Sequence, residues 1–266
     1  GLDLTELLPR IHAVAWLYEK RPVSREEVPE SYCDTWMSHH ANPMHTWEAV
    51  RSRVRIRIEL PHSVAADEFL KVEKRRFWDA CIAGDAYRTR LIAEDAARAA
   101  GLSLAPYRAI DRRILGATQK LSKVAGPVRA SRLRNAARRL HQRWIVSHAR
   151  LNFVCGSGYR YPVRKFFEIP AARSALVCYP CTGLSDYGFT DGVNCLYTVP
   201  EDFGRTARRL LQDESLRDRL ERKALELVLK NHSVERRASD LIECFRRLRD
   251  GRLKTAQFIA GEYVIE

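Results

Sequence analysis

Two groups of residues in the middle of the chain are suited to hold an anionic ligand. The apolar run Leu151–Cys155 predicts a buried strand. It ends at Gly156–Gly158, where backbone N–H groups can approach an anion without obstruction from Cβ atoms. Arg164 and Lys165 follow at the start of a predicted helix, where the helix dipole also favours negative charge, and Glu168 comes one turn after Arg164. This arrangement can divide a nucleotide's diphosphate and ribose hydroxyls between cations and a carboxylate; an ordinary surface ion pair is the alternative.

Three segments around these residues resemble the C-terminal domain of GT-B glycosyltransferases. They are residues 162–178 (PVRKFFEIPAARSALVC), 191–203 (DGVNCLYTVPEDF) and 210–242, the last of which contains an H-S-x-x-R segment beginning at His232 and Ser233. The chain is most similar to the CgeB-like, spore-maturation-type group, with retaining nucleotide-sugar transferases as broader relatives. The similarity extends over residues 75–247 and rests on the segments as a set.

The resemblance implies a nucleotide-sugar donor bound where the parallel strands end. Relatives place a glycine and a Y-x-x-R helix beside the donor, which match Gly84, Tyr87 and Arg90. Arg164, Lys165 and the glycine-turn amides would neutralise the diphosphate without a metal, and Glu168 would accept hydrogen bonds from ribose hydroxyls. The candidate donor-site residues are Gly84, Tyr87, Arg90, Gly156, Ser157, Gly158, Tyr161, Arg164, Lys165, Glu168, Thr182 and Gly183.

Two positions depart from the family pattern. Retaining relatives carry two glutamates separated by seven residues; Glu168 matches the second, but Tyr161 stands at the first. Arg173 replaces the usual glycine of the small-residue stretch. A non-catalytic nucleotide-sugar-binding or scaffold module is therefore an alternative to an active enzyme.

The order of predicted elements indicates an α/β protein of GT-B type. Residues 1–62 are expected to form a short or truncated N-terminal α/β region on the acceptor side, and 63–76 a linker. Residues 77–250 are expected to form a Rossmann-like nucleotide-sugar-binding domain, and 251–266 a tail that forms a strand or packs back on the first region. An N-terminal region of about 60 residues is roughly half of what a Rossmann-like half requires, so we expect a fragment or a natural truncation.

Within the second region, three segments are predicted to pair in a parallel sheet, since βαβ crossovers force parallel pairing. They are Phe77–Ala83, Leu151–Cys155 and Ala175–Tyr179. Further predicted elements are a weak strand at Ser103–Tyr107, a short strand at Cys195–Thr198, and helices at Glu201–Asp213, Leu216–Asn231 and Val234–Leu248. In the N-terminal region, strands are predicted at His12–Glu19, Tyr32–Ser38 and Val54–Leu60.

The formal charge of +13 is unevenly spread. Between Arg112 and Arg143 there are ten Lys and Arg residues and no acid. A solvated basic helix, an anionic membrane surface and a nucleic acid are the three interpretations, and the last is disfavoured because no nucleic-acid module is recognised. If Arg129–Arg143 faces a membrane or an acceptor, its arginines should be exposed on one side. Leu133, Leu140 and Trp144 should then turn inward or towards lipid.

The seven cysteines are scattered and odd in number, which predicts buried free thiols in a reducing compartment. Cys178 and Cys181 could form a redox pair or half a zinc site. Packing in a strand and turn is favoured, because no further ligands occur at suitable spacing. No apolar run approaches the ~18 residues that span a bilayer, and the first residues lack the features of a signal peptide. The expected location is the cytoplasm, with peripheral membrane association through residues 112–143 as an option.

The histidines supply one candidate catalytic residue. His39, His40 and His45 cluster with Asp34 but fit no standard ligand pattern, so neither a metal nor a cofactor is expected. His62 lies where the N-terminal region meets the expected linker, and it either faces the cleft or only shapes the turn.

The sequence thus predicts a glycosyltransferase that moves a sugar from a nucleotide-sugar to an acceptor of unknown class: a glycan, a lipid-linked acceptor or a protein. A binding or scaffold module and a basic membrane- or nucleic-acid-binding protein are the alternatives.

Overall fold

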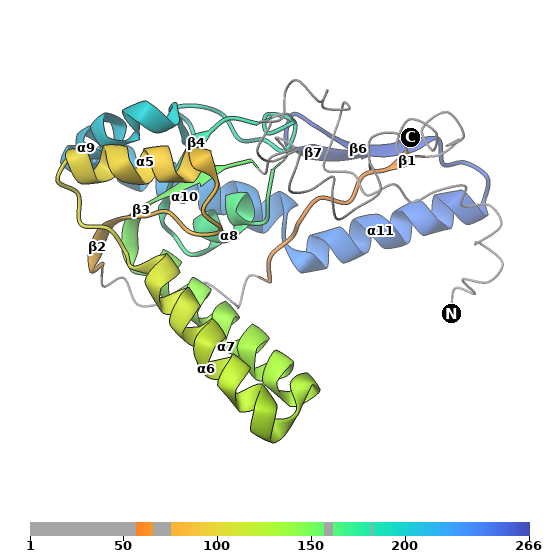
Figure 1. Ribbon diagram of the computed structural model, residues 1–266. Helices are drawn as coiled ribbons and strands as arrows, with labels where there is room; N and C mark the ends of the chain where they lie inside the picture. Colours follow the sequence, from red (N-terminus) through yellow and green to blue (C-terminus); the bar gives the residue numbers. More distant parts are fainter. Residues whose placement is uncertain (1–56, 66–75, 157–161, 182) are drawn as a thin grey trace.

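The computed structural model describes residues 57–65, 76–156, 162–181 and 183–266 (Figure 1). Its central sheet has four parallel strands in the order β2, β3, β4, β5. These are β2 (Trp78–Cys81), β3 (Ala149–Cys155), β4 (Ala175–Tyr179) and β5 (Leu196–Tyr197). The prediction of an α/β fold with a parallel sheet built on three named segments is confirmed. Predicted strand Ser103–Tyr107 is reduced to one bridge between Ala80 and Leu104, because Tyr107 already begins a helix.

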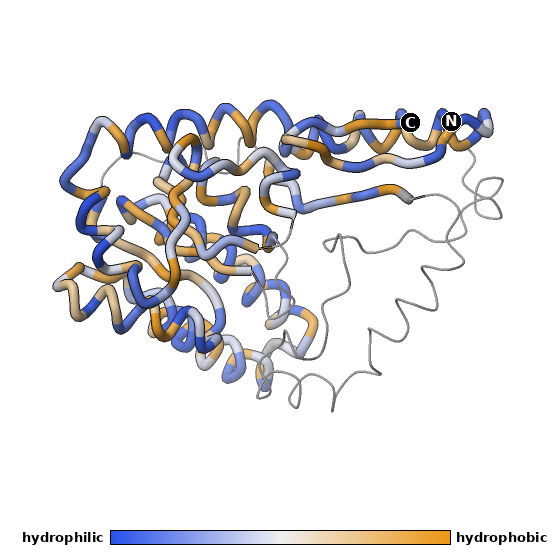
Figure 2. Tube along the Cα trace, turned by 90° about the horizontal axis from the view of Figure 1, so that it is seen from above, coloured by the Kyte–Doolittle hydropathy of each residue, from blue (hydrophilic) through white to orange (hydrophobic). Residues whose placement is uncertain are grey.

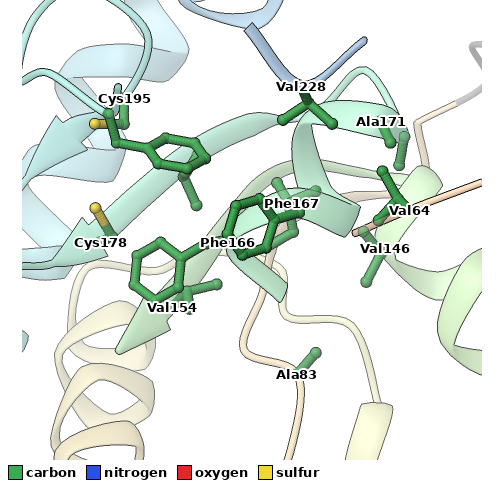
Figure 3. Close-up of a cluster of buried hydrophobic side chains, with 14 of the residues drawn as sticks. Val64, Ala83, Val146, Val154, Phe166, Phe167, Ala171, Cys178, Cys195 and Val228 are labelled. Carbon is green, nitrogen blue, oxygen red and sulfur yellow. The ribbon is translucent and has the colours of Figure 1, made fainter. Parts of the chain in front are cut away.

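Helices cover both faces of this sheet, so its strands are buried as continuous apolar runs, as parallel strands usually are. On one face, Leu151, Phe153 and Val177 pack against α5 (Arg88–Ala99) and α9 (Phe203–Gln212). On the other, Val154 and Leu176 pack against α8 (Lys165–Ala171) and the end of α7 (Pro127–Ser147). Figure 3 shows this second cluster, with Phe166, Phe167 and Val154 close together.

The remaining helices follow β5 in sequence. The 3-10 turn η3 (Pro200–Asp202) leads into α9, and α10 (Glu214–Asn231) and α11 (Val234–Arg249) follow. Asp213 and Ser233 cap the last two helices through side-chain bonds to the backbone N–H of Leu216 and Arg236. The helices predicted here are confirmed, and in Figure 2 the long helices alternate blue and orange along their length, as amphipathic helices do.

A second, small sheet joins the two ends of the described chain. Strand β1 (Arg57–Ile58) pairs in parallel with β6 (Thr255–Ile259), and β6 pairs antiparallel with β7 (Glu262–Ile265). The predicted tail strand is therefore present and packs back on the segment that precedes the linker. Buried Glu59 fixes this contact, because it accepts hydrogen bonds from the Tyr187 hydroxyl (2.7 Å) and the Phe258 N–H (2.8 Å).

The basic segment forms a helical hairpin that projects from the body of the molecule (Figure 1). Its arms are α6 (Tyr107–Ala125) and α7 (Pro127–Ser147), joined at Gly126, whose φ of 80° is in the region that favours glycine. Arg138 holds the arms together through two hydrogen bonds to the Asp111 carboxylate, at 2.7 and 3.1 Å.

The sequence left two orientations open for the leucines of α7, inward or towards lipid. Leu133 and Leu140 are 53% and 63% exposed, so the alternative in which they turn inward is wrong. Trp144 is also exposed on one side, although its ring packs edge-on against Trp78.

The predicted strands at residues 12–19 and 32–38, and the histidines at 39, 40 and 45, lie outside the described residues, as does the first half of the predicted strand at 54–60. No helix among the described residues is long and apolar enough to cross a membrane.

Candidate functional site

Glu168 lies at the centre of the candidate site. It sits on α8, whose neighbouring Phe166, Phe167 and Ile169 are buried against the sheet and thereby fix the helix. Arg164 directly precedes this helix, and its Nε contacts Glu168 Oε1 at 2.9 Å, so the ion pair that the sequence offered as an alternative is present. Gln142 of α7 donates a hydrogen bond to the other carboxylate oxygen. The carboxylate is therefore held from two sides in one orientation.

Arg90 lies at the ends of the neighbouring strands. It is buried on α5, and its Nη1 donates to the carbonyl oxygen of Asp85 at 3.1 Å. Its guanidinium is 4.8 Å from the centre of the Tyr87 ring, and its positive charge opposes the rise that burial causes in the pKa of the Cys155 thiol at the end of β3. Gly84 makes this position accessible: its φ is 112°, and a Cβ atom there would lie 2.5 Å from Nη1.

One nitrogen of Arg90 is a buried hydrogen-bond donor that lacks an acceptor among the described residues. Arg90 Nε is buried and has no hydrogen-bond partner within the described part of the chain. Buried donors are rarely left in this state, because the lost hydration costs roughly 1–3 kcal/mol. An anionic or hydroxyl-bearing ligand would supply the acceptor.

Lys165 places a third cation beside Arg90 and Arg164. Burial lowers the pKa of its ammonium group; the Glu168 carboxylate opposes this effect and the Arg90 guanidinium adds to it. Its Nζ lies 6.0 Å from the centre of the Tyr107 ring. A buried lysine next to a second cation is stabilised by an anion, so the cluster is suited to bind negative charge.

His62 faces the same cations. Burial, together with the positive charges of Arg164 and Lys165, lowers the pKa of its imidazole to about 4. His62 is therefore neutral near pH 7.

The structure brings together seven of the predicted residues: His62, Gly84, Tyr87, Arg90, Arg164, Lys165 and Glu168. Gly156 directly follows β3, and Gly183, with φ of 79°, lies in the turn after β4. Ser157, Gly158, Tyr161 and Thr182 fall outside the described residues. The prediction that Arg164 and Glu168 line the main cleft depends in part on those residues and stays a prediction.

Two described cavities lie away from these seven residues. One, of about 440 Å³, lies between α5 and α6 and is lined by Glu94, Arg98 and Arg108 among others. The other, of about 660 Å³, lies beside Arg173 and α10.

The backbone at Arg173 shows why the family usually has a glycine at this position. Its φ of 55° is in the left-handed region, where a glycine adopts the turn without strain and a residue with a Cβ pays roughly 1–2 kcal/mol. The side chain is exposed and takes no part in the cluster.

Sequence reasoning missed Gln142 and Tyr107. Both belong to the basic hairpin, whose charge suggested an outward-facing role, and Gln142 is 26 residues from Glu168 in sequence. No local pattern distinguishes this glutamine, because its role depends on which residues of α7 lie beside α8 in the folded chain.

The described cysteines are free thiols, most of them packed in the interior, as the interpretation of strand and turn packing expected. The six within the described residues are free, and all but Cys181 are buried. Burial raises the pKa of the Cys178 and Cys181 thiols, which disfavours the thiolate that a metal would need. Among the described residues, no group of three or more His, Cys, Asp or Glu side chains is placed to hold a metal ion.

Comparison with solved structures supports the fold. The sucrose-phosphate synthase of Thermosynechococcus elongatus superposes with a TM-score of 0.51 at 17% identity, over 94% of this chain and 63% of that one. A glycosyltransferase from Rickettsia africae gives a TM-score of 0.48 at 9% identity, over 73% of this chain and 57% of that one. The chain thus spans less than two thirds of these structures. No curated protein matches the sequence significantly.

The sequence match is more specific. A model of the family described as glycosyl transferase-like matches residues 88–243, which is more than half of the chain and includes α5, the basic hairpin, α8 and the strands between them. With its GT-B-type parallel sheet, the chain belongs to the glycosyl transferase-like family.

Proposed function

We propose that this chain binds a nucleotide-sugar donor at the carboxyl ends of β2 and β3 and transfers the sugar to an acceptor hydroxyl. Within its family we place it with the CgeB-like group, on the basis of residues 162–178 and 191–203. The observation that carries the proposal is a cluster of three cations around Lys165. Arg164 pairs with buried Glu168, Lys165 lies close to both Glu168 and Arg90, and Arg90 Nε lacks a hydrogen-bond partner among the described residues.

Each side chain has a role that follows from its chemistry. During transfer, the bond between the sugar's anomeric carbon and the diphosphate oxygen breaks, and a bond to the acceptor oxygen forms. Arg90, Arg164 and Lys165 would stabilise the negative charge that develops on the leaving diphosphate, without a metal or other cofactor. Glu168 would accept hydrogen bonds from the ribose hydroxyls, with Gln142 keeping its second oxygen in place.

His62 is the candidate to receive the proton of the acceptor hydroxyl. Its pKa of about 4 keeps it unprotonated at neutral pH, but the same value makes it a weak base, since a general base works best with a pKa near the working pH. When the anionic diphosphate leaves the site, its negative charge no longer offsets the positive charges of Arg164 and Lys165 that act on His62.

Binding of the donor is tested with an Arg164→Ala variant. Isothermal titration calorimetry with UDP-, GDP- and CMP-sugars should show that the variant binds the preferred donor more weakly by roughly 1.5–3 kcal/mol, the scale of hydrogen bonds to charged groups. Unchanged affinity would remove Arg164 from the donor site.

Arg236→Ala is the matched control. Arg236 Nε contacts buried Asp240 at 3.0 Å, also four residues along a helix, but on α11 away from the cluster. Its loss should leave donor affinity unchanged. Incubation with a radiolabelled donor and an acceptor then distinguishes two cases. An enzyme releases nucleoside diphosphate, whereas a binding module, the alternative suggested by Tyr161 at the glutamate position, does not.

A further inference from the structure

The end of the basic hairpin is an exposed apolar turn. Residues 124–128 read Val-Ala-Gly-Pro-Val, and Val124 and Val128 are 88% and 65% exposed. The turn lies at the far end of the two arms, beyond the body of the molecule (Figure 1). Burying a valine side chain in the protein would stabilise the fold, so two exposed valines at a protruding tip indicate a surface that is covered by something else.

Basic side chains surround this turn. Lys120 and Lys123 precede it on α6, and Arg129 and Arg132 follow it on α7; all four are exposed. None of the salt bridges within the described residues involves them. Arg138, by contrast, is occupied by Asp111 at the base of the hairpin and is not part of this tip.

The pattern has the chemistry of a membrane-surface anchor. An apolar tip ringed by unneutralised lysines and arginines complements an anionic bilayer, whose headgroups attract the cations while the acyl boundary accepts the valines. Nucleic acid would use the charges but would leave the valines without a partner. The two features together therefore favour lipid.

We propose that the tip of the α6–α7 hairpin, defined by Val124, Val128, Lys120, Lys123, Arg129 and Arg132, docks on an anionic lipid surface. Docking would leave the candidate donor site near the bilayer, because Gln142, which contacts Glu168, lies on α7 about 24 Å from Gly126 at 1.5 Å per residue. The proposal does not depend on the proposed sugar transfer.

Flotation of the full chain with vesicles tests the proposal. The protein should float with phosphatidylcholine–phosphatidylglycerol vesicles (7:3) at 0.1 M salt and not with phosphatidylcholine alone. Raising the salt to 1 M should reduce flotation, because the Debye length shortens from about 10 Å to about 3 Å. Failure of the wild-type chain to float with anionic vesicles at 0.1 M salt overturns the proposal.

Two sets of variants separate charge from apolar insertion. A quadruple variant with Lys120→Gln, Lys123→Gln, Arg129→Gln and Arg132→Gln should have a partition coefficient reduced about 700-fold, at about 1 kcal/mol per basic residue. Val124→Ser with Val128→Ser should reduce it about tenfold, whereas Val124→Leu with Val128→Leu should increase it. Wild-type flotation of either weakened variant contradicts the assignment of the tip.

The matched control removes four exposed arginines elsewhere, on α9 and α11: Arg205→Gln, Arg208→Gln, Arg209→Gln and Arg246→Gln. It has the same net charge as the quadruple tip variant and should still float. If the control loses flotation equally, net charge rather than the tip is responsible, and the proposal fails. If the wild-type chain does not bind lipid, two further results would overturn the proposal. One is binding of the tip to duplex or single-stranded RNA. The other is a dimer that dissociates in the serine variant.

Discussion

At the scale of single residues, His232 shows how a family motif is used structurally. It is completely buried, and its Nε2 donates to the Tyr187 carbonyl oxygen at 2.8 Å. Its Nδ1 lies 3.4 Å from Arg237 Nη2 and can only accept a hydrogen bond from this guanidinium. Protonation of Nδ1 would remove that acceptor and place two positive charges together, so the site requires the neutral ring.

This requirement makes stability depend on pH. Burial lowers the pKa of His232 to about 3, although the Tyr187 carbonyl opposes the shift. Between about pH 6.5 and 3 the unfolded state binds the proton more readily, so stability should rise with pH through this window and fall as the pH is lowered. We expect the free energy of unfolding to drop by roughly 2–4 kcal/mol on acidification from this residue.

Urea unfolding at a series of pH values measures the effect. His232→Gln retains a donor for Tyr187 but does not titrate, so its stability at pH 7 should be lower and its slope between pH 6.5 and 4 shallower than in the wild type. A slope identical to that of the wild type would mean that other groups cause the acid sensitivity.

At the scale of elements, close contact between two helices depends on one glycine. Gly204 on α9 faces the Ala96 carbonyl oxygen of α5, and a Cβ atom at Gly204 would overlap this oxygen and crowd Ala100. Because the Ala96 oxygen belongs to the backbone of α5, it cannot move aside as the end of a flexible side chain could. The covering of one sheet face by α5 and α9 therefore requires glycine at this position.

Gly204→Ala should lower the free energy of unfolding by roughly 1–3 kcal/mol, the scale of overpacking in a core. Gly116 on α6 is the matched control, since a Cβ atom there meets nothing within 4 Å. Gly116→Ala should stabilise the protein by roughly 0.5–1 kcal/mol through helix propensity. Chemical denaturation of both variants checks the pair, and equal effects of the two would contradict the close approach of α5 and α9.

At the scale of the whole molecule, Phe258 joins the small sheet to the core of the large one. It lies on β6, yet its ring packs in the cluster beneath the parallel sheet, with ring centres 5.3 Å from Tyr187 and 5.0 Å from His232. Arg237 lies over the same ring at 4.6 Å. The two sheets are thus stabilised by one shared set of contacts, and we expect them to unfold together.

Phe258→Ala should lower the free energy of unfolding by about 3–5 kcal/mol, as for other buried aromatic residues. Ile259→Ala, next in the strand but half-exposed, should cost much less. Near- and far-ultraviolet circular dichroism during denaturation should give coincident transitions in the wild type; separate transitions would show that the two sheets fold independently.

Features that depend on neighbouring residues in the chain could be predicted from the sequence. The apolar runs predicted β3 and β4, since a parallel strand buried on both faces has no polar alternation. The spacing of four residues between Arg164 and Glu168 indicated that they share a helix face, and the ion pair considered as the alternative to ligand binding is present.

The packing of whole elements determines which distant segments meet. Gln142 hydrogen-bonds Glu168, 26 residues away, because this part of α7 lies beside α8. His62 lies near Arg164 and Lys165, and the adjacent Val64 pairs with Ser233 before α11. The leucines of α7 form a helical stripe that would suit a core, but the hairpin extends away from the body and leaves them exposed. Such outcomes depend on the packing of whole elements, and no local pattern of residues encodes the direction in which a helix leaves the sheet.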